Sequence, residues 1–196
     1  MFFAPTNLKK SLGGNMNINK LQNCKRIGSI SLNLNESIKK SLDLSIDEGI
    51  SKIDMTKNTA RVYFIVVGGE IFKIGGSNSK GGIKDTISPY LGGNSGRPSD
   101  RTFGINYLIQ ERLREGWRVE FYCQWVPNQK VDIPLLWGSE ILESPLTYKT
   151  MEEGCLEQYL SHTGGVYPQW NFQEAGREWP KEIREGRMRL LEKTRK

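Results

Sequence analysis

The clearest hydrophobic pattern along the chain is a pair of short apolar runs separated by two glycines. Residues 62–67, Val-Tyr-Phe-Ile-Val-Val, are β-branched or aromatic, which is typical of a buried strand. After Gly68 and Gly69, residues 70–74 form a second run, Glu-Ile-Phe-Lys-Ile. A two-residue glycine turn supplies the positive φ angles that a tight hairpin needs. The pattern therefore predicts an antiparallel β-hairpin.

A helix and a third strand are predicted next. Ile105, Ile109 and Leu113 recur at helical spacing within residues 102–115. Residues 117–126 then alternate large apolar and polar side chains, which indicates a strand.

The remaining pattern is weaker. Leu156 and Leu160 favour a packed helix over residues 151–161, whereas residues 128–149 contain several helix and strand breakers and are expected to be irregular. The predicted fold class is α+β, with a small central antiparallel three-stranded sheet flanked by helices and preceded by an N-terminal arm.

Three regions are expected from composition. Residues 1–58 form a basic arm with short helical elements, one of them beginning at Asn35 as a candidate cap. Residues 59–175 form the core, and residues 176–196 form a charged helix or tail. The formal net charge is +6, and the first 60 residues supply nine basic and five acidic side chains, hence +4 of it. This charge indicates an anionic partner, which the arm would attract.

Several classes of protein are excluded or disfavoured. No apolar run approaches the roughly 18 residues of a membrane span, and the first residues lack the apolar region of a secretory signal. Three cysteines far apart in sequence predict no disulfide framework and favour a reducing, cytoplasmic location. A single histidine, His162, disfavours His-rich zinc sites and His-dependent nucleases.

Four pieces of sequence, in order, carry a resemblance to a known family. They are Val62-Tyr63-Phe64, then Lys73-Ile74-Gly75, a helix with Glu153, and Pro168-Gln169-Trp170-Asn171. Together they resemble the GIY-YIG nuclease superfamily, in its restriction-type or phage-type members. The resemblance implies a metal-dependent endonuclease that hydrolyses phosphodiester bonds in duplex DNA with Mg²⁺ or Mn²⁺. Cutting both strands makes a homodimer plausible.

The resemblance assigns roles to the two hairpin residues. Tyr63 would be the general base or would position the attacking water, and a nearby cation would have to lower its pKa from the usual value of about 10. Lys73 stands at the place of the second signature tyrosine, where it would lower the phenol pKa or hold the phosphate. The plain alternatives are a core aromatic residue for Tyr63 and a solvated strand residue for Lys73.

Acidic and amide residues near the end of the core are the next candidates. Glu153 is the preferred metal ligand, since carboxylate oxygens suit Mg²⁺, and Glu157 is the alternative one helical turn later. Both could equally be ordinary exposed carboxylates. Asn171 is a candidate DNA-binding residue that would hold a loop near the metal, or else a plain turn cap.

One family feature is missing. No arginine stands on the helix expected after Gly75, where the family usually neutralises the phosphate. Lys84 would replace it, or Arg97 or Arg101 would reach in from a later loop. Tyr90 is a candidate helper near the water, and Lys80, Arg97 and Arg101 are candidate contacts to the DNA backbone. The missing arginine also motivates a second hypothesis, a catalytically inactive DNA-binding module on the same scaffold.

Overall fold

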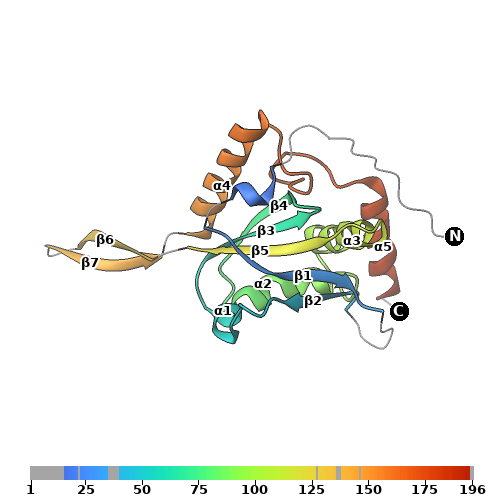
Figure 1. Cartoon of the computed structure of the whole chain (residues 1–196), viewed down its shortest axis with the longest axis horizontal. Helices are drawn as coiled ribbons and strands as arrows, with labels where there is room; N and C mark the ends of the chain where they lie inside the picture. The colour runs from blue at the N-terminus through green and yellow to red at the C-terminus, as the bar shows by residue number, and fades with distance from the viewer. Residues whose placement is uncertain are drawn as a thin grey trace.

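Five antiparallel strands form the central sheet, in the order β2-β1-β5-β3-β4 (Figure 1). The computed structural model describes residues 16–21, 23–34, 40–126, 128–135, 138–145 and 147–194. The strands are β1 (Lys25–Leu32), β2 (Leu42–Ile46), β3 (Arg61–Val67), β4 (Glu70–Ser77) and β5 (Val119–Trp125).

Strand β3 is the most deeply buried element. All seven of its residues are buried, because β4 and β5 pair with its two edges and side chains pack on both of its faces. The turn to β4 places Gly68 at φ 58° and Gly69 at φ 90°, the left-handed region that favours glycine. The predicted hairpin is confirmed.

The prediction of a three-stranded sheet is wrong, because β1 and β2 extend the sheet beyond β5. Both strands come from the region predicted to be an arm. In β1 the only buried residues are Ile27, Gly28 and Ile30, too few apolar positions to mark a strand in the sequence. Antiparallel pairing with β5, such as Ile30 with Val119, supplies the missing stabilisation. The helix expected from Asn35 falls largely on residues 35–39, outside the described part of the chain.

Helices cover both faces of the sheet. Helices α2, α3 and α5 pack over one face, while α4 and the short 3₁₀ helix η1 cover the opposite face of β3 and β4 (Figure 1). No helix within the described ranges is long and apolar enough to cross a membrane. The helices are η1 (Ile18–Lys20), α1 (Lys52–Thr56), α2 (Gly82–Leu91), α3 (Asp100–Arg114), α4 (Tyr148–Thr163) and α5 (Lys181–Lys193).

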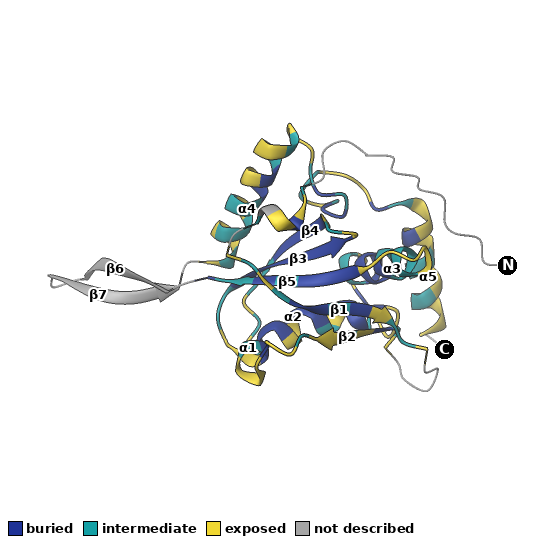
Figure 2. Cartoon of the chain, in the orientation of Figure 1, coloured by how far each residue is buried: buried dark blue, intermediate teal, exposed yellow. Residues whose placement is uncertain are grey.

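The two faces of β3 build two separate hydrophobic cores. Tyr63 and Ile65 face the core under α2 and α3, whereas Val62 and Phe64 face the core under α4. Strands β3, β4 and β5 are accordingly the most buried part of Figure 2. The alternation of a buried strand thus decides which helix each side chain meets.

A second, two-stranded sheet lies between β5 and α4 in the sequence. It consists of β6 (Asn128–Leu135) and β7 (Gly138–Pro145), paired antiparallel (Figure 1). Residues 128–149 were expected to be irregular, and that expectation is wrong. Turn-forming residues and Pro134 made a strand prediction unfavourable here, yet the backbone pairing of β6 with β7 continues past them.

Candidate active site

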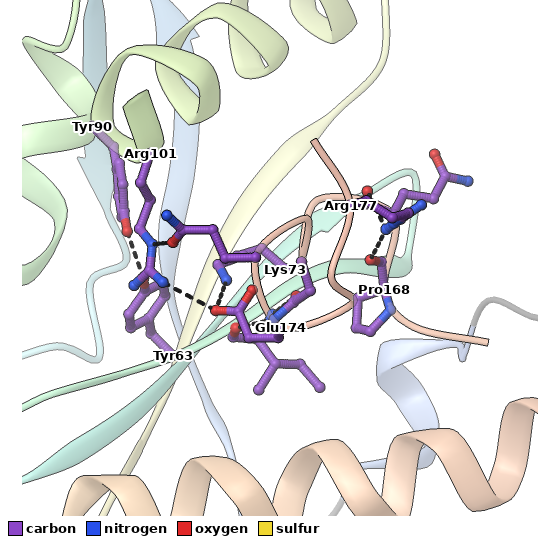
Figure 3. Close-up of polar contacts among 11 residues, drawn as sticks. Tyr63, Lys73, Tyr90, Arg101, Pro168, Glu174 and Arg177 are labelled. Carbon is purple, nitrogen blue, oxygen red and sulfur yellow. Dashed lines mark hydrogen bonds and ion pairs between the residues drawn. The ribbon is translucent and has the colours of Figure 1, made fainter. Parts of the chain in front are cut away.

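Two tyrosine hydroxyls meet on the α2 face of the sheet. Tyr63 projects from β3, Tyr90 projects from α2, and their hydroxyl oxygens are 2.6 Å apart (Figure 3). The Tyr63 ring stacks on Phe121 of β5, with centroids 5.6 Å apart. It also lies over Gly75, its partner on β4, where a β-carbon would collide with the phenol ring. Gly75 is therefore the residue that lets a tyrosine ring lie across β4.

Burial keeps both phenols protonated. It is the largest effect on Tyr63 and, together with Tyr90, raises the pKa of Tyr63 well above its ordinary value, although Arg101 acts in the opposite direction. Burial likewise raises the pKa of Tyr90. The expected lowering of the Tyr63 pKa by a cation is therefore wrong for this structure. Both hydroxyls are neutral groups that can donate and accept hydrogen bonds.

Lys73 lies on the same face as Tyr63, two residues from Gly75 on β4. Its side chain is 1% exposed and its Nζ donates to Oε1 of Glu174 at 2.9 Å (Figure 3). Burial lowers the pKa of Lys73, and the Glu174 carboxylate opposes that effect. The alternative of a solvated strand lysine is therefore wrong. Glu174 is the anionic partner that a buried ammonium requires, and the sequence offered no motif that pointed to it.

Arg101 enters the same cluster from the first turn of α3. Its Nη2 donates to Oε1 of Glu174 at 3.3 Å and its Nε donates to Oε1 of Gln173 at 2.8 Å (Figure 3). An arginine of α3, and not of α2, thus lines the cavity. Ser99, whose side chain accepts from the Thr102 N–H, caps this helix and fixes where Arg101 emerges.

An open cavity of ≈ 220 Å³ lies beside these side chains. Tyr63, Tyr90 and Arg101 line it, together with Gly76 and Asp85. Hydroxyl, guanidinium and carboxylate groups therefore face one small polar space, which suits a phosphate and the water that attacks it.

The structure brings Glu152, and not Glu153, to the cluster. Glu152 of α4 is half-buried and its carboxylate accepts from the Gly76 N–H on β4. Burial raises the pKa of Glu152, and Lys73 acts to lower it. Glu153 and Glu157 are exposed. The buried residues of α4 are Leu156 and Tyr159. Glu152 lies four residues before Leu156 and therefore on the same, inward side of the helix. This spacing is present in the sequence and could have indicated Glu152.

Asn171 is fully buried and binds the main chain of β4. Its Oδ1 accepts from the Ile74 N–H at 2.9 Å and its Nδ2 donates to the Ile74 carbonyl at 2.8 Å. These contacts match the loop-holding interpretation, and they leave no side-chain atom facing solvent for DNA. The same edge is bound again where Trp170 N–H donates to the Phe72 carbonyl at 2.8 Å. The segment after α4 is thereby fixed to β4, three and four residues before Glu174.

The remaining candidates lie outside the cluster. Lys80, Lys84 and Arg97 are exposed, and none of them lines the cavity within the described residues. Lys84 therefore does not face this cavity. Among the residues that the structure describes, no three histidine, cysteine, aspartate or glutamate side chains gather as a metal site.

A larger groove of ≈ 530 Å³ lies on the opposite face, between α4 and the β3–β4 hairpin. Phe64, Ile74, Met151 and Tyr159 line it, with polar groups such as His162. It contains no lysine, arginine or carboxylate among its described lining residues, so the charged cluster around Tyr63 is the better candidate for chemistry.

No known protein family and no curated protein sequence matches this chain. The solved structures similar to it include two nucleases. A mutant of bacteriophage T4 EndoII is 18% identical, over 76% of this chain and 90% of that chain, with a TM-score of 0.45. The restriction endonuclease HPY188I in complex with product DNA is 22% identical, over 78% of this chain and 84% of that chain, with a TM-score of 0.43. At these values the roles of the site residues rest on the geometry of this chain alone.

Proposed function

We propose that the protein is a divalent-metal-dependent endonuclease of the restriction or phage type, which hydrolyses phosphodiester bonds in duplex DNA. The observation that carries the proposal is the polar cavity lined by Tyr63, Tyr90 and Arg101, with the charges of Lys73 and Glu152 acting on the same cluster from beside it. Phosphodiester hydrolysis needs groups of these kinds: one to orient water, cations for the phosphate, and a carboxylate for a metal.

Each side chain has a role that its environment suits. The neutral Tyr63 hydroxyl, paired with Tyr90, would orient the attacking water by hydrogen bonding rather than act as a phenolate. Arg101, 40% exposed, would bind the phosphate oxygens from the open side. Lys73 would supply a second positive charge from the floor of the site.

Glu152 is the residue that would hold Mg²⁺ or Mn²⁺. Its oxygens are hard donors, and burial has raised its pKa, which a bound cation would reverse. Magnesium sites commonly use one or two carboxylates, with water and substrate phosphate completing the coordination. A metal so bound would stabilise charge on the leaving oxygen.

Binding of DNA would draw on exposed cations near the cavity. Lys80, Lys84 and Arg97 stand on the β4–α2 loop, on α2 and on the loop before α3. Their contribution would be salt-dependent and independent of base sequence. Cleavage of both strands requires two such sites, so we propose a homodimer or two successive nicks.

The test is a supercoiled-plasmid assay with Mg²⁺, with Mn²⁺ and with EDTA. We expect nicked or linear product only in the two metal lanes. Arg101→Ala and Glu152→Gln should each slow cleavage by about 100-fold, while Glu153→Gln, on the neighbouring exposed position, should cut like the wild type. DNA binding without cleavage under every metal would instead support the inactive DNA-binding module. Equal losses in the two glutamate variants would contradict the role of Glu152.

A further inference from the structure

One carboxylate at the site has no part in the chemistry proposed above. Oε1 of Glu174 accepts from Nζ of Lys73 at 2.9 Å and from Nη2 of Arg101 at 3.3 Å. One oxygen atom therefore joins Arg101 of α3, which lines the cavity, to the buried Lys73 of β4 beside it (Figure 3). The Glu174 side chain is 18% exposed.

The segment that carries Glu174 is held in place by hydrogen bonds that involve the main chain and by aromatic packing. Asn171 binds Ile74 through both of its amide atoms, and the Ala175 N–H donates to the Asn171 carbonyl at 3.0 Å. Phe172 packs on Trp179 with ring centroids 4.6 Å apart. Glu174 lies between these fixed points, so its carboxylate has a defined position relative to β4.

The two cations need such a partner for different reasons. Lys73 is almost fully buried, and a buried ammonium without an anion is costly. Arg101 is 40% exposed, so without a partner its guanidinium is free to turn toward water. A carboxylate between them also reduces the repulsion between two like charges. Glu152 and Arg101 are the other charged groups that face Lys73.

We propose that Glu174 is a positioning residue that holds Lys73 and Arg101 toward the cavity, so that both are in place when a phosphate binds. This assignment rests on the proposed nuclease function. Glu174 itself touches neither metal nor substrate in this proposal; it acts through the two cations. When the phosphate arrives, the exposed Arg101 can exchange one of its bonds from Glu174 to the phosphate, while Lys73 keeps its partner.

The test compares three variants of the full chain. Glu174→Gln keeps the size and the acceptor oxygen but removes the charge, while Glu174→Asp keeps the charge and shortens the side chain. Glu178→Gln is the matched control, because Glu178 is exposed on the same segment and pairs with Arg184 away from the cavity. Each is measured for DNA affinity in EDTA, and for single-turnover plasmid cleavage at saturating protein across a pH series.

We expect Glu174→Gln to cut at least about tenfold more slowly than wild type while its DNA affinity stays within about threefold. As the pH is raised, the cleavage rate of Glu174→Gln should fall at a lower pH than the rate of wild type. The reason is that the Glu174 charge, which favours the ammonium form of Lys73, is missing in this variant. Glu174→Asp should retain more activity than Glu174→Gln, and Glu178→Gln should equal wild type.

The failures are distinguishable. A wild type that cuts no DNA would overturn the proposed function and this assignment with it. A wild type that cuts, with Glu174→Gln as fast at every pH or more active than Glu174→Asp, would overturn this assignment alone. If thermal melts show that Glu174→Gln is unfolded, the assignment is judged from the cleavage rate of Glu174→Asp, which keeps the charge, relative to wild type.

Discussion

At the scale of single residues, burial determines the chemical state of the site. Tyr63 and Tyr90 remain neutral because they are buried against each other. Lys73 keeps a place in the interior because Glu174 faces it. The same residue types at the surface would have ordinary pKa values and would be poor candidates for catalysis.

The Glu174 pairing has a consequence for stability in acid. Burial acts to raise the pKa of Glu174, but Lys73, the hydrogen bond from it and Arg101 together lower it below its ordinary value. A carboxyl whose folded pKa is lowered stabilises the fold above its unfolded pKa, near about 4.3, and loses that contribution as pH falls through the folded pKa.

We therefore predict that Glu174→Gln lowers the free energy of unfolding at pH 7 and that the difference from wild type narrows toward pH 3. Urea unfolding at both pH values measures it. The Glu174 carboxylate also acts to raise the pKa of Glu152, so the difference between the two proteins contains the effect of Glu174 on that neighbour. A difference as large at pH 3 as at pH 7 would show that the contribution of Glu174 is not its charge.

At the scale of elements, β4 organises the site. It is the last strand in the order of the central sheet, and separate segments of the chain bind the main chain along its outer edge. The Ile71 N–H donates to the Met16 carbonyl at 3.0 Å, Ile74 is bound by Asn171, and the Gly76 N–H meets Glu152. An edge strand with satisfied hydrogen bonds does not invite pairing with another chain. The same contacts place Glu152 and the Glu174 segment beside the charged cluster of Lys73 and Arg101.

Asn171 tests this arrangement. Asn171→Leu leaves the buried N–H and carbonyl of Ile74 without partners, so we predict a loss of about 2–4 kcal/mol in unfolding free energy. Asn171→Asp keeps an acceptor for the N–H, but only its protonated form also keeps a donor for the carbonyl, so its loss should shrink as the pH falls. Urea unfolding at pH 7 and pH 4 gives these values, and equal losses in both variants at both pH values would mean that packing volume rather than hydrogen bonding is what Asn171 supplies.

Arg61 fastens another part of the site without a carboxylate. It is fully buried in β3, and its Nη1 donates to the Gly82 carbonyl at 2.6 Å and to Oγ1 of Thr86 at 2.8 Å. Its Nη2 donates to the Ser79 carbonyl at 2.9 Å. Arg61 thereby holds the β4–α2 loop and the start of the helix that carries Tyr90. A guanidinium has five N–H donors spread over a planar fork, whereas a lysine ammonium has three donors on a single nitrogen.

At the scale of the whole molecule, one sheet combines strands from distant parts of the chain. Arg26 of β1 donates from Nε to Oε1 of Glu120 on β5 and from Nη1 to Asp47 after β2, each at 2.6 Å. The Glu120 side chain is 3% exposed. Removing the arginine would leave a buried carboxylate with Arg118 as its other ion-pair partner.

We predict that Arg26→Met destabilises the protein by about 3 kcal/mol in a single cooperative transition. All five tryptophans lie at position 117 or later, so tryptophan fluorescence reports on the part of the chain that follows β4. A lower urea midpoint by fluorescence would show that β1 unfolds together with that part. Lys25→Met is the control, since Lys25 is 46% exposed and pairs with Asp54 at 3.5 Å. An unshifted fluorescence transition would contradict a single folding unit.

The candidate site could be predicted from the sequence where the residue and its neighbour are close in the chain. Tyr63, Lys73 and Gly75 share a hairpin, so register alone places them together. Arg101 was one of three open alternatives, and it lines the cavity because of the course of the loop before α3. Glu152, and not Glu153, lies beside the cluster because the buried side of α4 runs through Leu156 and Tyr159, which depends on how the helix packs.

The sequence by itself determined the β3–β4 hairpin, the positions of α3 and α4, and the placement of Tyr63 and Lys73 on one face of the hairpin, because these follow from local periodicity and glycine turns. Only the tertiary structure decided that β1 and β2 join the sheet, that Glu174 partners Lys73, and that Arg101 of α3 pairs with the same Glu174. These contacts join residues up to 101 positions apart. Their free energy comes from burial and charge pairing that exist only after the chain has folded.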